Sequence, residues 1–124
     1  MKTCLVVDDS RVIRKVACRI MHELAFETTE AENGADALIG CRKKMPDVVL
    51  LDWSMPQASG IDFLKALRSE TSGNHPVVVL CITENDTARI TEALDAGADE
   101  YIMKPFDRGI LEAKLAEVGM VRRQ

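Results

Sequence analysis

Four aliphatic residues and one carboxylate stand in a row as Val48-Val49-Leu50-Leu51-Asp52. The aliphatic residues are continuous and do not alternate with polar ones, which is typical of a strand buried on both faces of a parallel sheet. Two further runs have the same character, Cys4-Leu5-Val6-Val7 and Val77-Val78-Val79-Leu80-Cys81-Ile82. These runs predict the centre of a parallel sheet, with Asp52 at the carboxyl end of one strand.

Two shorter segments are predicted as the remaining strands of this sheet. Glu27-Thr28-Thr29-Glu30-Ala31 has the polar character of an edge strand. Glu100-Tyr101-Ile102-Met103 is followed shortly by Pro105, which stops the strand. The sheet is therefore expected to have five strands.

Between the strands, apolar residues recur with the period of a helix. Ser10 is a predicted N-cap of the first helix and Asp86 of the fourth, which Gly97 is expected to end. The second and third helices are predicted over Gly34–Lys44 and Gly60–Arg68. The positions predicted to face the core are Val12, Ile13, Val16, Ala17, Ile20, Met21 and Leu24 in the first helix, Ile90, Ala93 and Leu94 in the fourth, and Ile110, Leu111, Leu115 and Val118 in a fifth that starts near Asp107.

The order of these elements, five repeats of a strand followed by a helix, predicts the fold class. Right-handed crossovers place the helices on both faces of an open parallel sheet. We expect one doubly wound α/β domain, (βα)5, spanning residues 1–124. Its predicted strand order is 2-1-3-4-5, which is the flavodoxin-like order.

Length and composition agree with one domain and exclude some function classes. A chain of 124 residues can bury a core without disulfides, and its net charge of −4 disfavours nucleic-acid binding, although Arg122-Arg123 is basic. No apolar run approaches the roughly 20 residues of a membrane span, and the N-terminus does not resemble a signal peptide. We therefore expect a cytoplasmic protein without nucleic-acid or membrane partners. Its four cysteines, which show no metal-binding spacing, are expected to be buried and reduced: Cys4, Cys18, Cys41 and Cys81.

Polar residues follow the predicted strands where ligands bind in such sheets, beyond the carboxyl ends. They are Asp8-Asp9 after the first strand, Asp52 after the third, Thr83-Glu84 after the fourth and Lys104-Pro105 after the fifth. One such residue alone would be explained as a helix cap or a loop residue. The strand order, however, brings the first and third strands together, so three carboxylates are expected to share one pocket.

Crowded carboxylates raise one another's pKa and destabilise the fold unless a cation is present. Mg2+ prefers oxygen ligands and is commonly held by one or two carboxylates together with a phosphate. Lys104 and Thr83 would supply an ammonium and a hydroxyl for the phosphate oxygens that the metal does not reach. The predicted chemistry is in-line attack of a carboxylate on a phosphoryl group, with the metal and the lysine neutralising charge.

Several motifs resemble those of response-regulator receiver domains of bacterial two-component systems, particularly the single-domain CheY-like proteins. The resemblance covers essentially the whole chain. The matching segments are Leu5-Val6-Val7-Asp8-Asp9-Ser10, Ala31-Glu32-Asn33-Gly34, Leu51-Asp52-Trp53-Ser54-Met55-Pro56, Ala96-Gly97-Ala98-Asp99-Glu100-Tyr101 and Lys104-Pro105-Phe106.

This resemblance implies a role for each residue of the site. Asp52 would be the phosphoacceptor and also a ligand of Mg2+, Asp8 and Asp9 would position the metal, and the backbone carbonyl of Ser54 would be a further ligand. Lys104 would contact the phosphoryl group. The protein would catalyse only its own phosphorylation and dephosphorylation and would otherwise act as a switch.

The resemblance also implies how the switch reaches the surface. Thr83 would close onto a phosphate oxygen and Tyr101 would turn inward behind it. Taken alone, Thr83 could be a strand residue, Tyr101 an edge aromatic and Lys104 a solvated lysine. The inference therefore depends on all three occurring together at the expected positions. The face of the fourth helix, fifth strand and fifth helix would bind the target protein, and it should include Arg89, Glu92, Tyr101, Arg108 and Glu112.

Glu84 is the clearest departure from the family pattern, because the residue after the switch threonine is often small. It either points outward without effect or tunes dephosphorylation through the attacking water. The segment from Thr83 to Tyr101 is also one residue shorter than in many relatives, which leaves the path of the fourth helix open.

Several pathways remain open for such a protein. The phosphodonor would be a histidine kinase or a histidine phosphotransferase, and the expected function is that of a stand-alone output protein. Alternatives are a phosphorelay intermediate that passes the group to a histidine phosphotransferase, and a chemotaxis regulator that binds the flagellar motor. A small Mg2+-dependent aspartyl phosphatase is disfavoured, because the sequence has no room for a cap domain.

Overall fold

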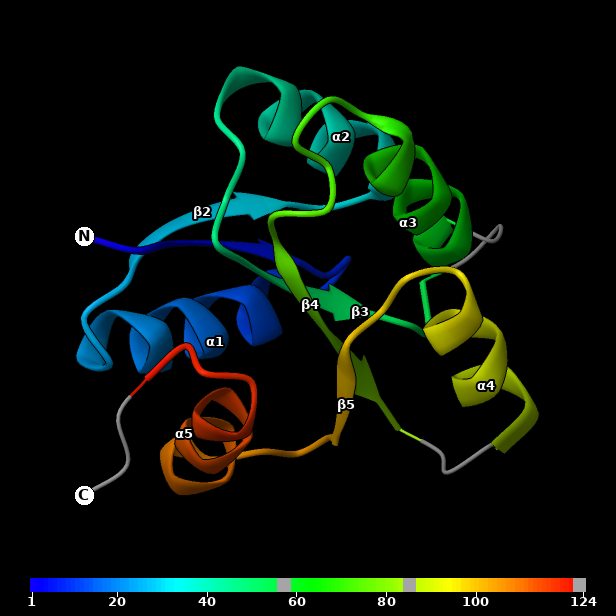
Figure 1. Cartoon of the computed structure of the whole chain (residues 1–124). Coiled ribbons are helices and arrows are strands. Elements are labelled where there is room, and N and C mark those ends of the chain that lie inside the picture. Colours follow the sequence, from blue (N-terminus) through cyan, green and yellow to red (C-terminus); the bar gives the residue numbers. More distant parts are fainter. Residues whose placement is uncertain (56–58, 84–86, 122–124) are drawn as a thin grey trace.

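The computed structural model of the chain describes residues 1–55, 59–83 and 87–121. Strands and helices alternate along it, as the sequence predicts (Figure 1). The strands are β1 (Thr3–Val7), β2 (Glu27–Ala31), β3 (Val48–Asp52), β4 (Val77–Ile82) and β5 (Glu100–Met103), and the helices are α1 (Arg11–Glu23), α2 (Gly34–Lys43), α3 (Ser59–Ser69), α4 (Thr87–Asp95) and α5 (Arg108–Glu117).

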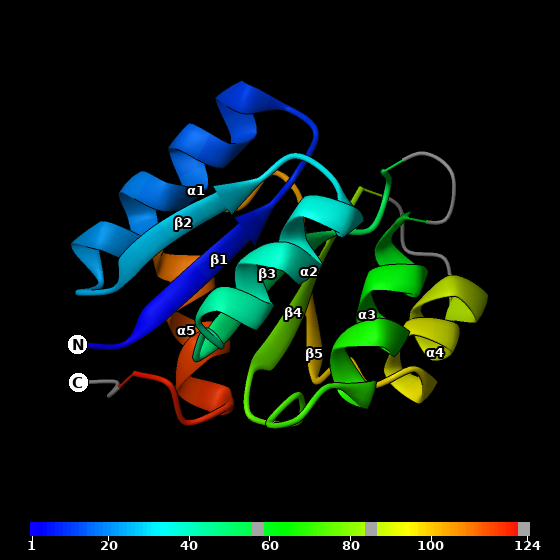
Figure 2. The same ribbon diagram turned by 90° about the horizontal axis from the view of Figure 1, so that it is seen from above.

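The five strands form one parallel sheet in the order β2-β1-β3-β4-β5, which confirms the predicted topology. Helices α1 and α5 cover one face, and α2, α3 and α4 cover the other (Figures 1 and 2). Successive residues of β3 point to opposite faces, so Val49 and Leu51 belong to the α2–α4 core and Val48 and Leu50 to the α1–α5 core. Burial on both faces explains why the aliphatic runs are continuous.

Helix caps define where several helices begin and end. The predicted cap Ser10 accepts a hydrogen bond from the backbone N–H of Ile13 at 3.3 Å, which satisfies one free donor of the first turn. Asp107 caps α5 in the same way through Ile110. Gly97 follows α4 with a φ of +117°, a conformation that residues with a side chain rarely adopt.

Four apolar side chains predicted to face the core are instead exposed: Val12 by 71%, Val16 by 48%, Leu94 by 40% and Ile110 by 49%. These side chains lie on α1, α4 and α5, which pack against the sheet with one side only. In α1 the buried residues are Ala17, Ile20 and Met21. A helical period therefore predicts which side faces inward, but not how wide the covered stripe is.

The four thiols are free, and three of them are buried as predicted. Cys18 is only half-buried: it lies in the middle of α1 and packs against the outside of the α1–α5 core, so this part of the prediction was wrong. Burial raises the pKa of the Cys81 thiol to about 12 and that of Cys41 to about 11, which keeps both neutral at physiological pH.

Some sequence predictions concern residues outside the described ranges. These are the capping role of Asp86, the influence of Glu84, the position of Pro56 in a matching segment and the basic pair Arg122-Arg123. Among the described residues, no helix has the length and apolar character that a membrane crossing requires.

Candidate functional site

Three aspartates meet at the carboxyl edge of the sheet. Because β1 pairs with β3 in parallel, with Val7 beside Leu51, the residues that follow on the two strands emerge side by side. One carboxylate oxygen from each of Asp8, Asp9 and Asp52 lies within 4.8 Å of the others. Asp8 and Asp52 are each only 3% exposed, whereas Asp9 is exposed. The structure therefore confirms that the three carboxylates share one pocket.

Lys104 projects into this pocket from the end of β5. Its Nζ donates hydrogen bonds to Asp8 Oδ2 at 2.9 Å and to Asp52 Oδ1 at 3.0 Å. Burial alone would lower the pKa of the Lys104 ammonium, but the hydrogen bonds to the two carboxylates outweigh it and raise the pKa. The lysine therefore stays charged at neutral pH and links the ends of three strands.

The two oxygens of Asp52 have different surroundings. Oδ1 accepts hydrogen bonds from the backbone N–H of Ser54 at 3.0 Å, from the Ser54 hydroxyl at 2.7 Å and from Lys104. Oδ2 accepts no hydrogen bond from the described residues. The first oxygen holds the carboxylate in place, and the second is left available for chemistry.

Asp8 is held by similar local contacts. Its Oδ1 accepts the backbone N–H of Ser10 at 2.8 Å, and its backbone carbonyl accepts a hydrogen bond from Arg14 at 2.8 Å. The start of α1 therefore positions the carboxylate whose other oxygen meets Lys104.

Negative charge exceeds positive charge in the pocket, since three carboxylates face one ammonium. Partial loss of hydration, together with the charges of Asp52 and Asp8, raises the pKa of Asp9 above its usual value. A set of closely spaced carboxylate oxygens with excess negative charge is the environment that Mg2+ prefers. The donor set therefore fits the predicted metal.

The remaining predicted residues lie around this centre. Thr83 directly follows β4, and it is exposed. Tyr101 is half-buried and packs against the α2–α4 core, with Lys114 Nζ 5.7 Å from the centre of its ring. Tyr101 pairs with Leu80 on β4, so along the strand direction it lies farther from the carboxyl ends than Thr83. The switching roles of both residues stay predictions.

Two contacts at the site were not predicted from the sequence. The Ser54 hydroxyl binds Asp52, although only its backbone carbonyl was assigned a role. Arg89 of α4 donates a hydrogen bond at 3.0 Å to the carbonyl of Trp53, which directly follows Asp52. Arg89 was predicted only as part of a distant binding face, and no local signal links positions 36 residues apart.

A comparison with known protein families shows the family of the chain. The model of the response regulator receiver domain matches residues 4–116. The chain belongs to this family. Receiver domains are phosphorylation-dependent switches that generally require Mg2+ and that act with histidine kinases and downstream targets.

Individual relatives of this receiver include chemotaxis proteins and a transcriptional regulator. Chemotaxis protein CheY-3 of Vibrio cholerae is 36% identical over 115 residues, which cover 92% of this chain and 88% of CheY-3. Phosphate regulon transcriptional regulatory protein PhoB of Escherichia coli is 37% identical over 115 residues, 92% of this chain but only 50% of PhoB. The chain thus spans about half the length of that relative.

Solved structures confirm the receiver fold. Chemotaxis protein CheY4 of Vibrio cholerae superposes with a TM-score of 0.89 at 30% sequence identity. The superposition covers 95% of this chain and 98% of CheY4. The flavodoxin-like strand order predicted from the sequence is therefore the order of the family.

Proposed function

We propose that this receiver accepts a phosphoryl group on Asp52 from a phosphohistidine donor, in a Mg2+-dependent reaction, and thereby switches its binding to a target protein. The contrast between the two oxygens of Asp52 supports this most directly. Three donors fix Oδ1, while Oδ2 has no hydrogen-bond partner among the described residues. A carboxylate held in this way is a preorganised nucleophile.

The proposed reaction transfers one phosphoryl group between two proteins. Asp52 Oδ2 attacks phosphorus in line, a P–O bond forms, and the P–N bond breaks with its electron pair passing to the donor imidazole. When bound, Mg2+ would neutralise charge on the phosphoryl oxygens; Asp8, Asp9, Asp52 and the carbonyl of Ser54 are the residues that would hold it. Hydrolysis of the product would return Asp52 and release phosphate.

Lys104 has a defined part in this proposal. Before transfer, its ammonium is bound to Asp8 and Asp52. Once the phosphoryl group has arrived, Lys104 exchanges its bond to Asp52 for one to a phosphoryl oxygen. Thr83 supplies a hydroxyl to another oxygen, and Tyr101 turns inward behind it.

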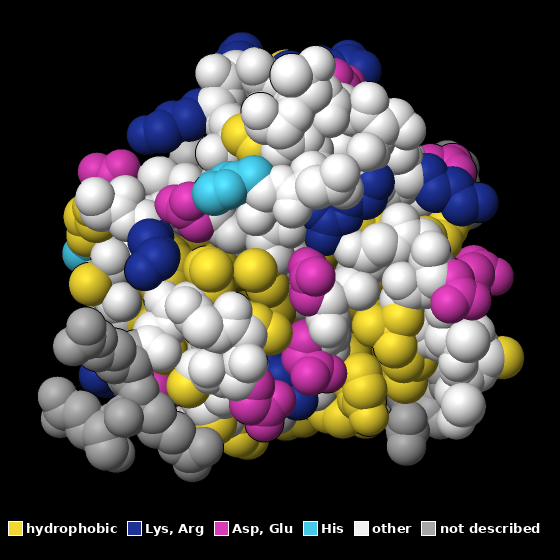
Figure 3. Space-filling view, in the orientation of Figure 1, with side chains coloured by type: hydrophobic (Ala, Val, Ile, Leu, Met, Phe, Trp, Pro, Cys, Tyr) yellow, Lys and Arg dark blue, Asp and Glu magenta, His cyan; other side chains and the backbone are white. Residues whose placement is uncertain are grey.

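The proposed output surface is formed by α4, β5 and α5, and it includes Arg89, Glu92, Tyr101, Arg108 and Glu112. Exposed apolar side chains also lie on these elements, namely Leu94, Met103 and Ile110. Figure 3 shows hydrophobic side chains reaching the surface between β5 and α4. A mixed apolar and charged surface of this kind suits a protein partner. A partner in chemotaxis or in a phosphorelay stays a prediction, and so does a cytoplasmic location.

The test is phosphorylation of the purified chain by acetyl phosphate with Mg2+. We expect one acid-labile phosphoryl group per chain, detected as a mass increase of the intact protein, and no increase with EDTA. Asp52→Asn should abolish the modification, while the exposed Asp95→Asn should leave it unchanged. Modification that persists in Asp52→Asn would show that the acceptor is another residue.

A further inference from the structure

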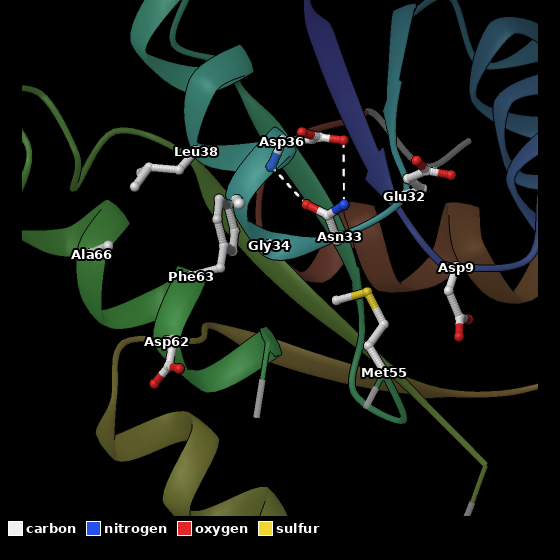
Figure 4. A pocket seen from close by; sticks show the side chains of 11 residues that line it. Asp9, Glu32, Asn33, Gly34, Asp36, Leu38, Met55, Asp62, Phe63 and Ala66 are labelled. Atoms are coloured by element: carbon white, nitrogen blue, oxygen red, sulfur yellow. Dashed lines mark hydrogen bonds between the residues drawn. The ribbon is translucent and has the colours of Figure 1, made fainter. Parts of the chain in front are cut away.

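A second recess lies beside the carboxylate pocket, between the start of α2 and the length of α3 (Figure 4). Its volume is about 650 Å³, and it is open to solvent. Its floor is apolar and consists of Leu38, Met55, Phe63 and Ala66. We call this recess the acidic cleft because of the residues around it.

The rim of the acidic cleft carries four carboxylates, those of Asp9, Glu32, Asp36 and Asp62. No lysine or arginine lines the cleft, and none of the four carboxylates forms an ion pair with another described residue. Asp9 is shared with the metal pocket, so the charge that belongs to the cleft alone comes from the other three.

Among the described residues, some acidic side chains elsewhere on the surface, unlike those of the rim, are paired within the chain. Glu30 contacts both Arg14 and Lys15, and Glu70 contacts Arg42. Basic residues of the chain neutralise those carboxylates. The carboxylates of the rim have no such ion pairs in the described part of the chain, so their charge can attract an external partner. A positively charged partner is therefore the complementary one.

The shape of the cleft favours a protein segment over a small molecule. Its volume falls within the range of about 300–1,000 Å³ that ligand sites occupy, but such sites enclose most of their ligand. This cleft is open, and Glu32, Asp36 and Asp62 are exposed around its mouth. An apolar side chain can fill the floor while basic neighbours on the same segment meet the rim.

We propose that the acidic cleft docks a segment of a partner protein in which an apolar side chain stands between lysines or arginines. This surface lies on α2 and α3, apart from the face of α4, β5 and α5 assigned to the output. The proposal goes beyond the phosphorylation of Asp52 and does not depend on it, because docking uses the resting protein.

The test uses two synthetic peptides, Ac-RKLFRK-amide and its charge-reversed counterpart Ac-EELFEE-amide, titrated into isotope-labelled protein with EDTA. We expect the basic peptide to shift the NMR signals of Leu38 and Phe63 in a saturable manner, and the acidic peptide to shift neither. Binding should weaken as sodium chloride is raised, because exposed charges are screened. Shifts spread evenly over the surface, or equal binding of both peptides, would overturn the proposal.

Charge reversal provides the matched comparison. The double variant Glu32→Lys/Asp62→Lys changes two exposed side chains at the rim and should bind the basic peptide about tenfold or more weakly. Glu27→Lys/Asp95→Lys changes net charge equally at exposed positions away from the cleft and should bind within about twofold of the unchanged protein. Equal weakening in both variants would show only non-specific attraction and would overturn the proposal.

Three further measurements keep the outcome decisive. n-Hexylguanidinium should bind more weakly than the basic peptide; equal affinity would identify a small-cation site instead of a docking surface. The rim variant should still be phosphorylated by acetyl phosphate, so loss of docking and loss of the proposed phosphorylation are separate results. Retained dispersion of its NMR spectrum establishes that the variant is folded.

Discussion

The two edges of the sheet both carry carboxylates, but their charges are balanced at one edge and crowded at the other. At the amino edge, Asp47 accepts the backbone N–H of Thr3 at 2.8 Å and contacts His75 at 2.8 Å. Asp99 accepts the N–H of Val78 at 2.7 Å and contacts Arg68. At the carboxyl edge, three aspartates cluster together, and Lys104 forms ion pairs with two of them, Asp8 and Asp52.

This difference separates a structural use of a carboxylate from a chemical use. A carboxylate with a full set of donors ties elements together and stabilises the fold. Crowded carboxylates repel one another, so they lower stability, a cost that the proposed binding of Mg2+ would explain. Substitutions at the two edges should therefore change stability in opposite directions.

The largest effect is expected from Arg68→Ala at the amino edge. Arg68 donates hydrogen bonds to the carbonyls of Gly73, Pro76 and Gly97 and to Asp99, and its side chain is only 15% exposed. Its loss leaves several acceptors without a partner and should lower the free energy of unfolding by about 3 kcal/mol. Urea unfolding measures this change.

The control for this variant is Arg42→Ala. The Arg42 side chain is 59% exposed in its ion pair with Glu70, so its loss should cost less than about 1 kcal/mol. Equal losses in the two variants would contradict the structural role assigned to Arg68.

An intermediate effect is expected from Asp47→Asn, about 1 kcal/mol of destabilisation at neutral pH. Burial alone would raise the pKa of Asp47, but hydrogen bonds from His75 and Thr3 outweigh it and hold the pKa below its usual range. A carboxyl group with a lowered pKa stabilises the fold above its unfolded pKa of about 3.9, and the stabilisation is lost as pH falls through the folded pKa.

The pH dependence provides the check on this variant. The difference in unfolding free energy between the unchanged protein and Asp47→Asn should be full at about pH 5 and should shrink at about pH 3. A difference that grows on acidification would contradict the assignment of Asp47 as a paired carboxylate.

The smallest effect, with the opposite sign, is expected from Asp9→Asn in EDTA. Removing one of three crowded charges should raise the free energy of unfolding by about 0.5 kcal/mol, a small amount because Asp9 is exposed and screened by solvent. Added Mg2+ should stabilise the unchanged protein more than the variant. Asp95→Asn, far from the pocket, should show neither effect; destabilisation by Asp9→Asn in EDTA would contradict the crowding argument.

The strands and their order were predictable because buried parallel strands leave an unmistakable aliphatic signal, as in Val48-Val49-Leu50-Leu51. Exposure of helix residues such as Val12 and Ile110 was not predictable in the same way. It depends on how closely each helix approaches its neighbours, and this distance is set by the packing of the whole chain.

At the site, the sequence could predict which residues meet but not which atoms bond. The topology brings Asp8, Asp52 and Lys104 together, because parallel strands end at one edge. The three hydrogen bonds on Asp52 Oδ1, and the contact from Arg89 to Trp53, depend on side-chain conformations and on tertiary packing. Neither the side-chain conformations nor the tertiary packing can be predicted from the local sequence.

The position of Asp52 on β3 has a consequence for which parts of the protein can move. β3 lies between β1 and β4, and all five of its residues are buried. Amides in such a central strand are protected from hydrogen exchange and open only when most of the domain unfolds. Exchange should therefore stay slow along β3 before and after phosphorylation, while any change in rate is confined to the segments around it. The central strand serves as the fixed reference against which those segments are repositioned.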